Sequence, residues 1–268
     1  MSDSIPKYER RLDAMHRALV DDFRQLVEKI PISPGQVVLD VGCGDGFFAS
    51  LLACSEAQVI GVDSADAFLQ LARHNTQAQP NIRLVKGDAR ELPFDDASAD
   101  VIWSGYSMHS YPDIPRCLNE FRRVLRPGGI LAVLESDNVH SIMLSWPPDL
   151  ELAVRQAEHQ EIQDEDTYVG TYFPRFALDL LTKAGFEDCR PEYILIHRQG
   201  PANETLTEYV KLYLTDLLER THDKLSDKMR SKFSLLASPT SDQFLPHRNS
   251  FFFGSLQVLM LARASGVF

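Results

Sequence analysis

The chain has few cysteines and no long apolar run. Its four cysteines, Cys43, Cys54, Cys117 and Cys189, include no CxxC pair, so the sequence indicates neither a zinc site nor a disulfide framework, and we expect no metal. No apolar stretch reaches the roughly 18 residues of a membrane-spanning helix. The N-terminus MSDSIPKYERR also has no apolar segment typical of a secretory signal. We therefore expect a cytoplasmic protein that does not insert into membranes.

Basic residues are also scarce. The 268 residues include 27 Lys and Arg against 38 Asp and Glu, which gives a formal net charge of −11. Phosphate backbones and anionic membrane surfaces repel such a chain, so nucleic acid is not an expected partner. A composition with 44% apolar and 24% charged residues is typical of one globular domain with a substantial core.

Short apolar runs alternate with helix-like segments along the first half of the chain. The runs typical of β-strands are VVLDV (37–41), QVIGVD (58–63), IRLVKGD (82–88), ADVIWS (99–104) and ILAVLE (130–135). This βαβ rhythm predicts an α/β fold with a doubly wound, Rossmann-like and mostly parallel sheet. Residues 1–30, ahead of the first run, are predicted to form an amphipathic helix that covers the sheet.

The second half of the chain is less regular. Residues 173–199 are predicted to form a helix that stops at Gly185, followed by a strand. Residues 251–264 are predicted to form a final strand interrupted by Gly254. Residues 138–172 and 200–248 exceed the usual length of a connecting loop and contain helical patterns. We therefore expect a single domain of residues 1–268, with the cofactor site in 37–135 and these two insertions forming a lid over the C-terminal edge of the sheet.

A glycine-rich turn follows the first strand, in VVLDVGCGDGFFASLL (37–52). A turn of this kind, leading into a helix, lets a ligand lie against bare backbone, and both a dinucleotide and S-adenosylmethionine are candidates. The dinucleotide fingerprint GxGxxG would need glycine where Phe47 stands; the glycines are instead Gly42, Gly44 and Gly46. Asp40 would repel a pyrophosphate but suits the cationic amino group of S-adenosylmethionine, so it favours the second ligand.

Two more acids stand at strand ends. Asp63 ends the second strand, where a carboxylate can accept hydrogen bonds from both ribose hydroxyls. Asp88 ends the third strand, where a carboxylate can bind the exocyclic amine of adenine while the Ala89 N–H donates to a ring nitrogen. A single acid at a strand end is usually a helix cap or a solvated turn. Three at the same edge of a sheet point to a ligand.

Four motifs in order, VLDVGCGDG, GVDSA, KGDARELPFDDASADVIWSGYSMHSYPD and LRPGGILAVLE, resemble the class I S-adenosylmethionine-dependent methyltransferases. The pattern is most similar to the broad group that includes the quinone-biosynthesis C-methyltransferases, and it covers residues 37–135. The resemblance implies a seven-stranded sheet whose last strand is antiparallel. It also implies S-adenosylmethionine as cofactor and S-adenosylhomocysteine as product.

The resemblance further implies which residues contact the cofactor. Ten positions belong to the matched motifs: Gly42, Cys43, Gly44, Asp63, Ser64, Asp88, Ala89, Ser104, Gly105 and Tyr106. Asp40 commonly reaches the methionine end, often through water. Some relatives also close the site with an N-terminal helix, which would bring Tyr8 and Arg11 to the methionine carboxylate. The alternative for these two residues is an exposed helical face.

The resemblance implies in-line displacement of the methyl group by an O, N or C nucleophile. His109, in the loop after the fourth strand, is the candidate general base, and the alternative is that it only shapes the loop or contacts the acceptor. The loop has neither the Pro-Pro-aromatic sequence of DNA amino-methyltransferases nor the paired glutamates of protein-arginine enzymes, which leaves a small-molecule acceptor. Aromatic residues of the two insertions would line an apolar cavity for a ring-bearing acceptor, or else belong to the core: Trp146, Tyr168, Tyr172, Phe173, Tyr209, Tyr213 and Phe233.

Two other functions compete with this reading. The first is an NAD-dependent oxidoreductase with a degenerate fingerprint, against which Asp40 and Phe47 speak. The second is a non-catalytic scaffold or sensor that binds the cofactor, or nothing, in a methyltransferase-like fold. The three acids argue that the cofactor site is kept, but they do not by themselves establish turnover.

Overall fold

The centre of the molecule is a mostly parallel β-sheet, seen in a computed structural model that describes residues 9–53, 56–137, 139–160 and 169–266. Five strands run parallel in the order β3-β2-β1-β4-β5. Their bounds are β1 Val37–Val41, β2 Gln58–Asp63, β3 Ile82–Lys86, β4 Ala99–Gly105 and β5 Leu125–Glu135. The order reverses between β1 and β4, and open α/β sheets bind ligands beyond the carboxyl ends of the strands at such a point.

The last strand, β8 (Phe252–Ala264), is antiparallel to its neighbours. One of its edges pairs with β5 and the other with β7 (Phe186–Gln199). The mostly parallel sheet with an antiparallel last strand is therefore confirmed. The structure adds an eighth, short strand, β6 (Ile142–Leu144), which pairs with β8 beyond the end of β5. It also shows β8 as continuous through Gly254, which pairs with both β6 and β7.

The fifth strand begins earlier than the sequence predicts. Helix α4 (Ile114–Val124) ends directly before this strand, and RPGG at 126–129 lies inside β5, whose pairing with β4 shifts register between Ala99 and Val101. The proline and glycines thus form an irregular start of the strand instead of a separate turn.

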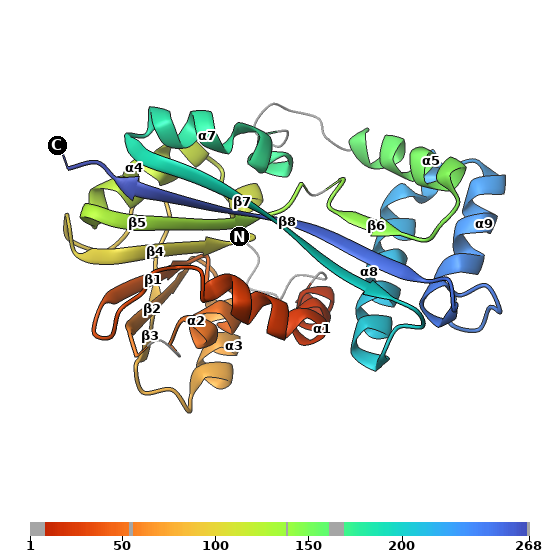
Figure 1. Cartoon of the computed structure of the whole chain (residues 1–268), viewed down its shortest axis with the longest axis horizontal. Coiled ribbons are helices and arrows are strands. Elements are labelled where there is room, and N and C mark those ends of the chain that lie inside the picture. Colours follow the sequence, from red (N-terminus) through yellow and green to blue (C-terminus); the bar gives the residue numbers. More distant parts are fainter. Residues whose placement is uncertain (1–8, 54–55, 138, 161–168, 267–268) are drawn as a thin grey trace.

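Helices cover both faces of the sheet (Figure 1). On one face lie α1 (Glu9–Val27), α2 (Phe47–Leu52) and α3 (Asp66–Thr76), and on the other lie α4 and α7 (Phe173–Lys183). The spacing that predicts the first helix places Leu19, Phe23 and Leu26 in the core, each at most 1% exposed. Burying a side chain of this size stabilises the fold by about 1.5 to 3 kcal/mol, so this face of α1 fixes the helix across the sheet.

A helical end extends the molecule beyond the sheet. The long strands β7 and β8 run from the sheet to a group of three helices, α5 (Pro148–His159), α8 (Glu204–Thr221) and α9 (Asp227–Ala237) (Figure 1). Helix α8 packs along α1, and an ion pair of 2.9 Å joins Arg11 to Asp216. The two segments expected as lid insertions supply these helices. Within the described ranges, no helix combines the length and apolar character needed to cross a bilayer.

Candidate functional site

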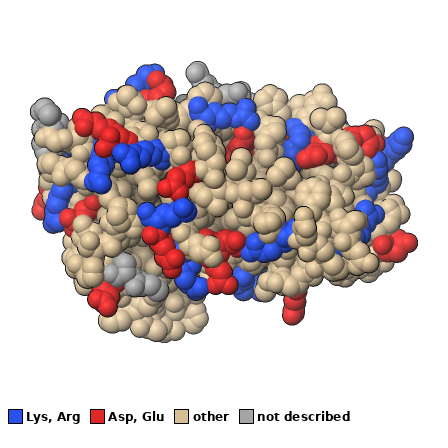
Figure 2. Space-filling model, viewed as in Figure 1, with Lys and Arg blue, Asp and Glu red and all other residues tan. Residues whose placement is uncertain are grey.

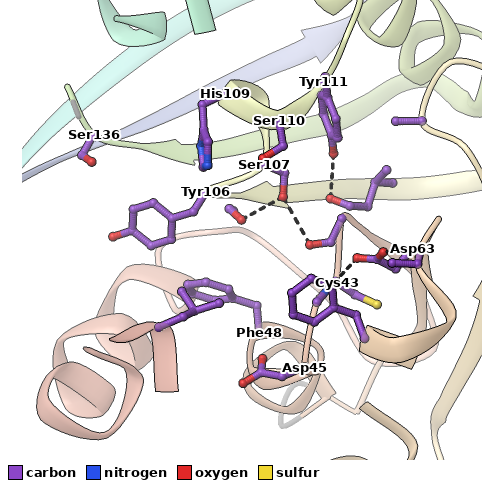
Figure 3. Close-up of a pocket in the computed structure, with 18 of the residues that line it drawn as sticks. Cys43, Asp45, Phe48, Asp63, Tyr106, Ser107, His109, Ser110, Tyr111 and Ser136 are labelled. Carbon is purple, nitrogen blue, oxygen red and sulfur yellow. Dashed lines mark hydrogen bonds between the residues drawn. The ribbon is translucent and has the colours of Figure 1, made fainter. Parts of the chain in front are cut away.

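A cavity of about 850 Å³ lies at the carboxyl ends of the parallel strands. Its walls come from α1, the glycine turn after β1, the tips of β2 and β3, the loop after β4, and the helical end of the molecule. Figure 3 shows the glycine-turn side with Cys43 and Asp63 and the opposite side with Tyr106 and His109. The cavity is large enough for a nucleoside-sized ligand together with a small second molecule.

Two glycines of the turn are required for different reasons. Gly42 has φ +75°, and a Cβ there would lie 2.4 Å from the Oγ of Ser107, so the loop after β4 packs directly on its backbone. Gly44 has φ +52° and no atom within 4 Å of the position a Cβ would take. Both conformations favour glycine. The turn is therefore tight toward the protein at Gly42 and open at Gly44.

The backbone N–H groups of the glycine turn are used inside the protein. Those of Gly42 and Cys43 donate to the carbonyl oxygen of Val62, at 2.8 and 3.0 Å. The N–H of Gly44 donates to Oδ2 of Asp63 at 3.0 Å, and those of Gly46 and Phe47 donate to the Cys43 carbonyl oxygen and to Oδ1 of Asp45. A dinucleotide site needs such groups for its pyrophosphate. These five N–H groups of the turn are therefore already used within the protein.

Asp63 and Ser64, which the sequence analysis assigns to a ribose site, lie in the cavity wall at the tip of β2. Asp63 accepts hydrogen bonds from the N–H groups of Gly44 and Ala65, at 3.0 and 2.9 Å. Burial raises the pKa of this carboxyl above its usual value, although these hydrogen bonds oppose the shift. A carboxylate can accept about four hydrogen bonds, so Asp63 retains acceptor capacity toward the cavity.

Asp40 lies beneath the turn and does not belong to the cavity wall. The residue is 1% exposed, and its Oδ2 has no hydrogen-bond partner among the described residues. Burial, and then the charges of Asp63 and Asp45, raise its pKa to about 8. The structure therefore places Asp40 below the cavity and not in its wall, and its role toward a ligand stays a prediction.

The tip of β3 supplies a more exposed acid. Asp88 and Ala89 lie in the wall, together with Arg90, whose guanidinium pairs with the Asp88 carboxylate at 2.6 Å. The hydrogen bond from Arg90 lowers the pKa of Asp88. Asp88 is therefore charged at neutral pH at the cavity end opposite the helical end of the molecule.

The loop after β4 carries the next predicted residues. Gly105 and Tyr106 line the cavity, whereas Ser104 is fully buried and its hydroxyl lies 3.1 Å from that of Tyr111. Tyr106 has φ +51°, unusual for a residue with a Cβ, and its hydroxyl donates to Gln257 of β8 at 2.5 Å. A strained residue held by a distant strand is a common feature of functional sites.

His109 lies in the cavity wall, in a 3-10 turn of residues 108–110. Its side chain is 38% exposed, and its Nδ1 lies 3.9 Å from Oε2 of Glu135 at the end of β5. In Figure 3 the ring points from its loop toward the space above Tyr106 and Phe48. The structure thus places the predicted base at the cavity and adds a carboxylate behind it.

Helix α1 contributes more to the site than the sequence analysis expected. Arg11 lies in the wall, paired with Asp216 of α8, and Tyr8 lies outside the described residues. His16, which was not a candidate, is 5% exposed, stacks on Phe47 at 3.9 Å between ring centroids, and lies 3.5 Å from Asp45. Its place on the apolar face of the predicted helix was the available signal.

The helical end gives the cavity a polar region that the sequence analysis missed. Glu158 is 5% exposed and is paired with Arg155 at 2.8 Å and with Arg220 at 3.3 Å. Arg155 also donates to the hydroxyl of Tyr213. Of the aromatic candidates, Tyr209 and Tyr213 reach the cavity, while four others are buried and do not line it, and Tyr168 lies outside the described residues. Those four are Trp146, Tyr172, Phe173 and Phe233.

Comparison with known proteins gives the following matches. Residues 39–133 match the methyltransferase domain family. Over 116 residues the chain is 34% identical to a demethylmenaquinone methyltransferase from Staphylococcus aureus, a stretch that is 42% of the chain and 48% of that protein. The chain therefore spans about half the length of the curated relative it matches.

The fold is similar to that of solved structures over nearly the whole chain. The YcgJ protein from Bacillus subtilis aligns with a TM-score of 0.60 and 18% identity, over 93% of this chain and 99% of that one. A phosphoethanolamine N-methyltransferase from Haemonchus contortus, solved with phosphomonomethylethanolamine and S-adenosylhomocysteine, aligns with a TM-score of 0.55 and 18% identity, over 95% of this chain and 57% of that one. Residues 39–133 therefore match a methyltransferase domain, and the chain as a whole shares the fold of these solved structures.

Proposed function

We propose that this protein binds S-adenosylmethionine and transfers its methyl group to a small-molecule acceptor, releasing S-adenosylhomocysteine. The observation that carries the proposal is the glycine turn, whose N–H groups are paired inside the protein while acids gather around it. A pyrophosphate would find the N–H groups of Gly42, Cys43 and Gly44 already paired and would be repelled by the neighbouring acid Asp45. A ligand with a cationic amino group and a neutral nucleoside suits both features.

The cavity residues fit the two ends of this cofactor. Asp63 would bind the ribose hydroxyls, and Asp88 with Ala89 would bind adenine, since these groups line the same end of the cavity. Arg11, at the other side of the glycine turn, would meet the methionine carboxylate. Burial and neighbouring acids raise the pKa of Asp40, and a cationic amino group bound above the turn would favour its ionised form, so the two groups would stabilise each other.

The remaining wall would hold the acceptor. When bound, S-adenosylmethionine supplies an activated methyl carbon, so the protein has to align a nucleophile with that carbon and exclude water. Met15, Phe48 and Ile142 give this part of the cavity an apolar side, and Glu158 with Arg220 gives it a polar end. This combination supports a ring-bearing or lipophilic acceptor with at least one polar group, with O, N or C as the methylated atom.

Two further observations support a small-molecule acceptor. The relative from Staphylococcus aureus is named for a quinone-ring substrate. On the face shown in Figure 2, Lys and Arg are interspersed with Asp and Glu, and basic side chains form no continuous patch there. The cytoplasmic location expected from the sequence belongs to the same proposal.

Calorimetry with S-adenosylhomocysteine, S-adenosylmethionine and NAD⁺ tests the cofactor. We expect binding of the first two and none of NAD⁺; heat only with NAD⁺, or with none of the three, would contradict the proposal. A screen of small phenols, quinols, amines and carboxylic acids for release of S-adenosylhomocysteine then tests turnover. Cofactor binding with no product from any acceptor class would favour the non-catalytic scaffold instead.

A further inference from the structure

Glu135 is a buried carboxylate that the proposed function leaves unexplained. It ends β5 and is 1% exposed. Its Oε1 accepts a hydrogen bond of 2.7 Å from the backbone N–H of Met108. Its Oε2 is buried and has no hydrogen-bond partner in the part of the chain that the structure describes. An unpaired buried carboxylate oxygen is costly, so its position calls for a physical reason.

The group nearest to this oxygen is the imidazole of His109, with Nδ1 at 3.9 Å. The two residues meet because β4 and β5 are parallel neighbours in register, with Gly105 opposite Leu134, so that the turn after β4 lies against the end of β5. The backbone of Gly170 packs directly against this turn, since a Cβ at Gly170 would lie 3.0 Å from the Cα of His109. Tyr106, which also feels the charge of Glu135, has its hydroxyl hydrogen-bonded to Gln257.

We propose that Glu135 is a positioning residue that holds His109 with its proton on Nδ1 and its Nε2 bare toward the cavity, so that the acceptor is a molecule whose methylated atom carries a proton. This inference rests on the proposed function. A hydroxyl, an N–H or an acidic C–H meets the requirement. A thioether or a tertiary amine loses no proton on methylation and would gain nothing from a base.

The chemistry balances as follows. The acceptor atom forms a bond to the methyl carbon, the carbon–sulfur bond breaks with its electron pair on sulfur, and the acceptor proton passes to Nε2 of His109. The resulting imidazolium carries the positive charge that sulfur loses. The carboxylate of Glu135 stabilises this imidazolium from the buried side and keeps the ring oriented.

The tautomer follows from the donors and acceptors around the pair. An ionised carboxylate only accepts hydrogen bonds, so the nitrogen of His109 that faces Glu135 carries the hydrogen and the other nitrogen is bare. The separation of 3.9 Å is an electrostatic contact, longer than a hydrogen bond. Such contacts in sites without substrate are commonly long and shorten when the substrate is bound.

Nitrogen-15 NMR of the histidine side chains, at a pH where they are neutral, tests the inference without knowledge of the acceptor. In the wild-type protein saturated with S-adenosylhomocysteine, His109 is expected as the Nδ1–H tautomer, with assignment from H109Q. The E135Q variant is expected to invert this tautomer. Its single amide oxygen is needed by the N–H of Met108, so its amide N–H₂ faces His109 and requires a bare Nδ1.

D137N is the matched control. Oδ1 of Asp137 lies 3.1 Å from Nδ1 of a different histidine, His140. Neither residue lines the cavity. This variant is expected to leave the tautomer and turnover at His109 unchanged. Calorimetry with S-adenosylhomocysteine on all variants distinguishes the proposed function from the role of Glu135. If the proposed function is wrong, the wild type does not bind S-adenosylhomocysteine, whereas the tautomer of His109 is measured independently by NMR.

Turnover gives the second readout. On a protic acceptor found by screening, E135Q is expected to lower kcat on the order of 100-fold with little change in KM for S-adenosylmethionine. An Nε2–H tautomer in the wild type would overturn the inference even if E135Q does not fold. An unchanged kcat in a folded E135Q would overturn it as well. So would a tertiary amine as the preferred acceptor, turned over equally fast by the wild type and by E135Q.

Discussion

The carboxylate of Asp63 accepts a hydrogen bond from the backbone N–H of Gly44, with 3.0 Å between Oδ2 and the nitrogen. This contact ties the tip of β2 to the glycine turn after β1. The same carboxylate also accepts from the N–H of Ala65, at the start of α3. Asp63 therefore shapes the turn and offers its remaining acceptor capacity to a ligand, so its replacement should affect both.

Asp63→Ala should lower the affinity for S-adenosylhomocysteine at least about tenfold, because a hydrogen bond to a charged group contributes about 1.5 to 3 kcal/mol. It should also lower the melting temperature, since the N–H of Gly44 loses its acceptor. Calorimetry and thermal unfolding measure the two effects. Asp63→Asn keeps one acceptor oxygen, so its affinity should lie between those of the wild type and Asp63→Ala. Wild-type affinity in Asp63→Ala would show that Asp63 does not bind the ligand.

Asp88→Ala should weaken cofactor binding with only a small loss of stability, since the backbone N–H of Arg90 loses its acceptor. Its ion pair with Arg90 is partly exposed, with 34% and 40% of the two side chains accessible, and such pairs contribute little. The matched control is Asp66→Ala, which removes an exposed acid paired with Lys86 outside the cavity wall. The assignment of Asp88 to the adenine end does not survive if both variants bind S-adenosylhomocysteine equally well.

Gly42→Ala and Gly44→Ala should separate folding from binding. Gly42→Ala brings a Cβ within 2.4 Å of Ser107 and is expected to destabilise the protein by about 2 to 4 kcal/mol. Gly44→Ala meets no protein atom, so it should be no less stable than the control Gly35→Ala, which also has a positive φ and open surroundings. Only Gly44→Ala should combine near-normal stability with loss of S-adenosylhomocysteine binding, as seen by denaturant titration and calorimetry.

Asp40 should make the stability of the protein depend on pH. Its folded pKa of about 8 lies above the ordinary value of an aspartate, so the contribution of Asp40 to stability is fully present below about pH 4 and is lost as the pH rises through 8. Asp40→Asn does not titrate. The free energy of unfolding of this variant minus that of the wild type should therefore increase between pH 5 and pH 9, by roughly a few kcal/mol. Denaturant unfolding at the two pH values checks this, and a constant difference would contradict it.

The sequence by itself determined the sheet, the glycine turn and the edge at which the acids gather. Alternating apolar runs and helices specify parallel strands, and the carboxyl ends of parallel strands meet at one edge. Asp63 and Asp88 therefore had to come to the same side as the turn. The positive φ of Gly42 and Gly44 was also readable, because few other residues adopt that conformation.

Only the tertiary structure decided which side chains face the cavity. Asp40 and Asp63 both stand near the ends of neighbouring strands, yet packing buries the first beneath the turn and leaves the second in the wall. The approach of Glu135 to His109 depends on the register of β4 against β5 and on the contact of Gly170. The polar end at Glu158 requires helices that are distant in sequence to pack together. Such contacts depend on long-range packing, which local patterns of residues do not encode.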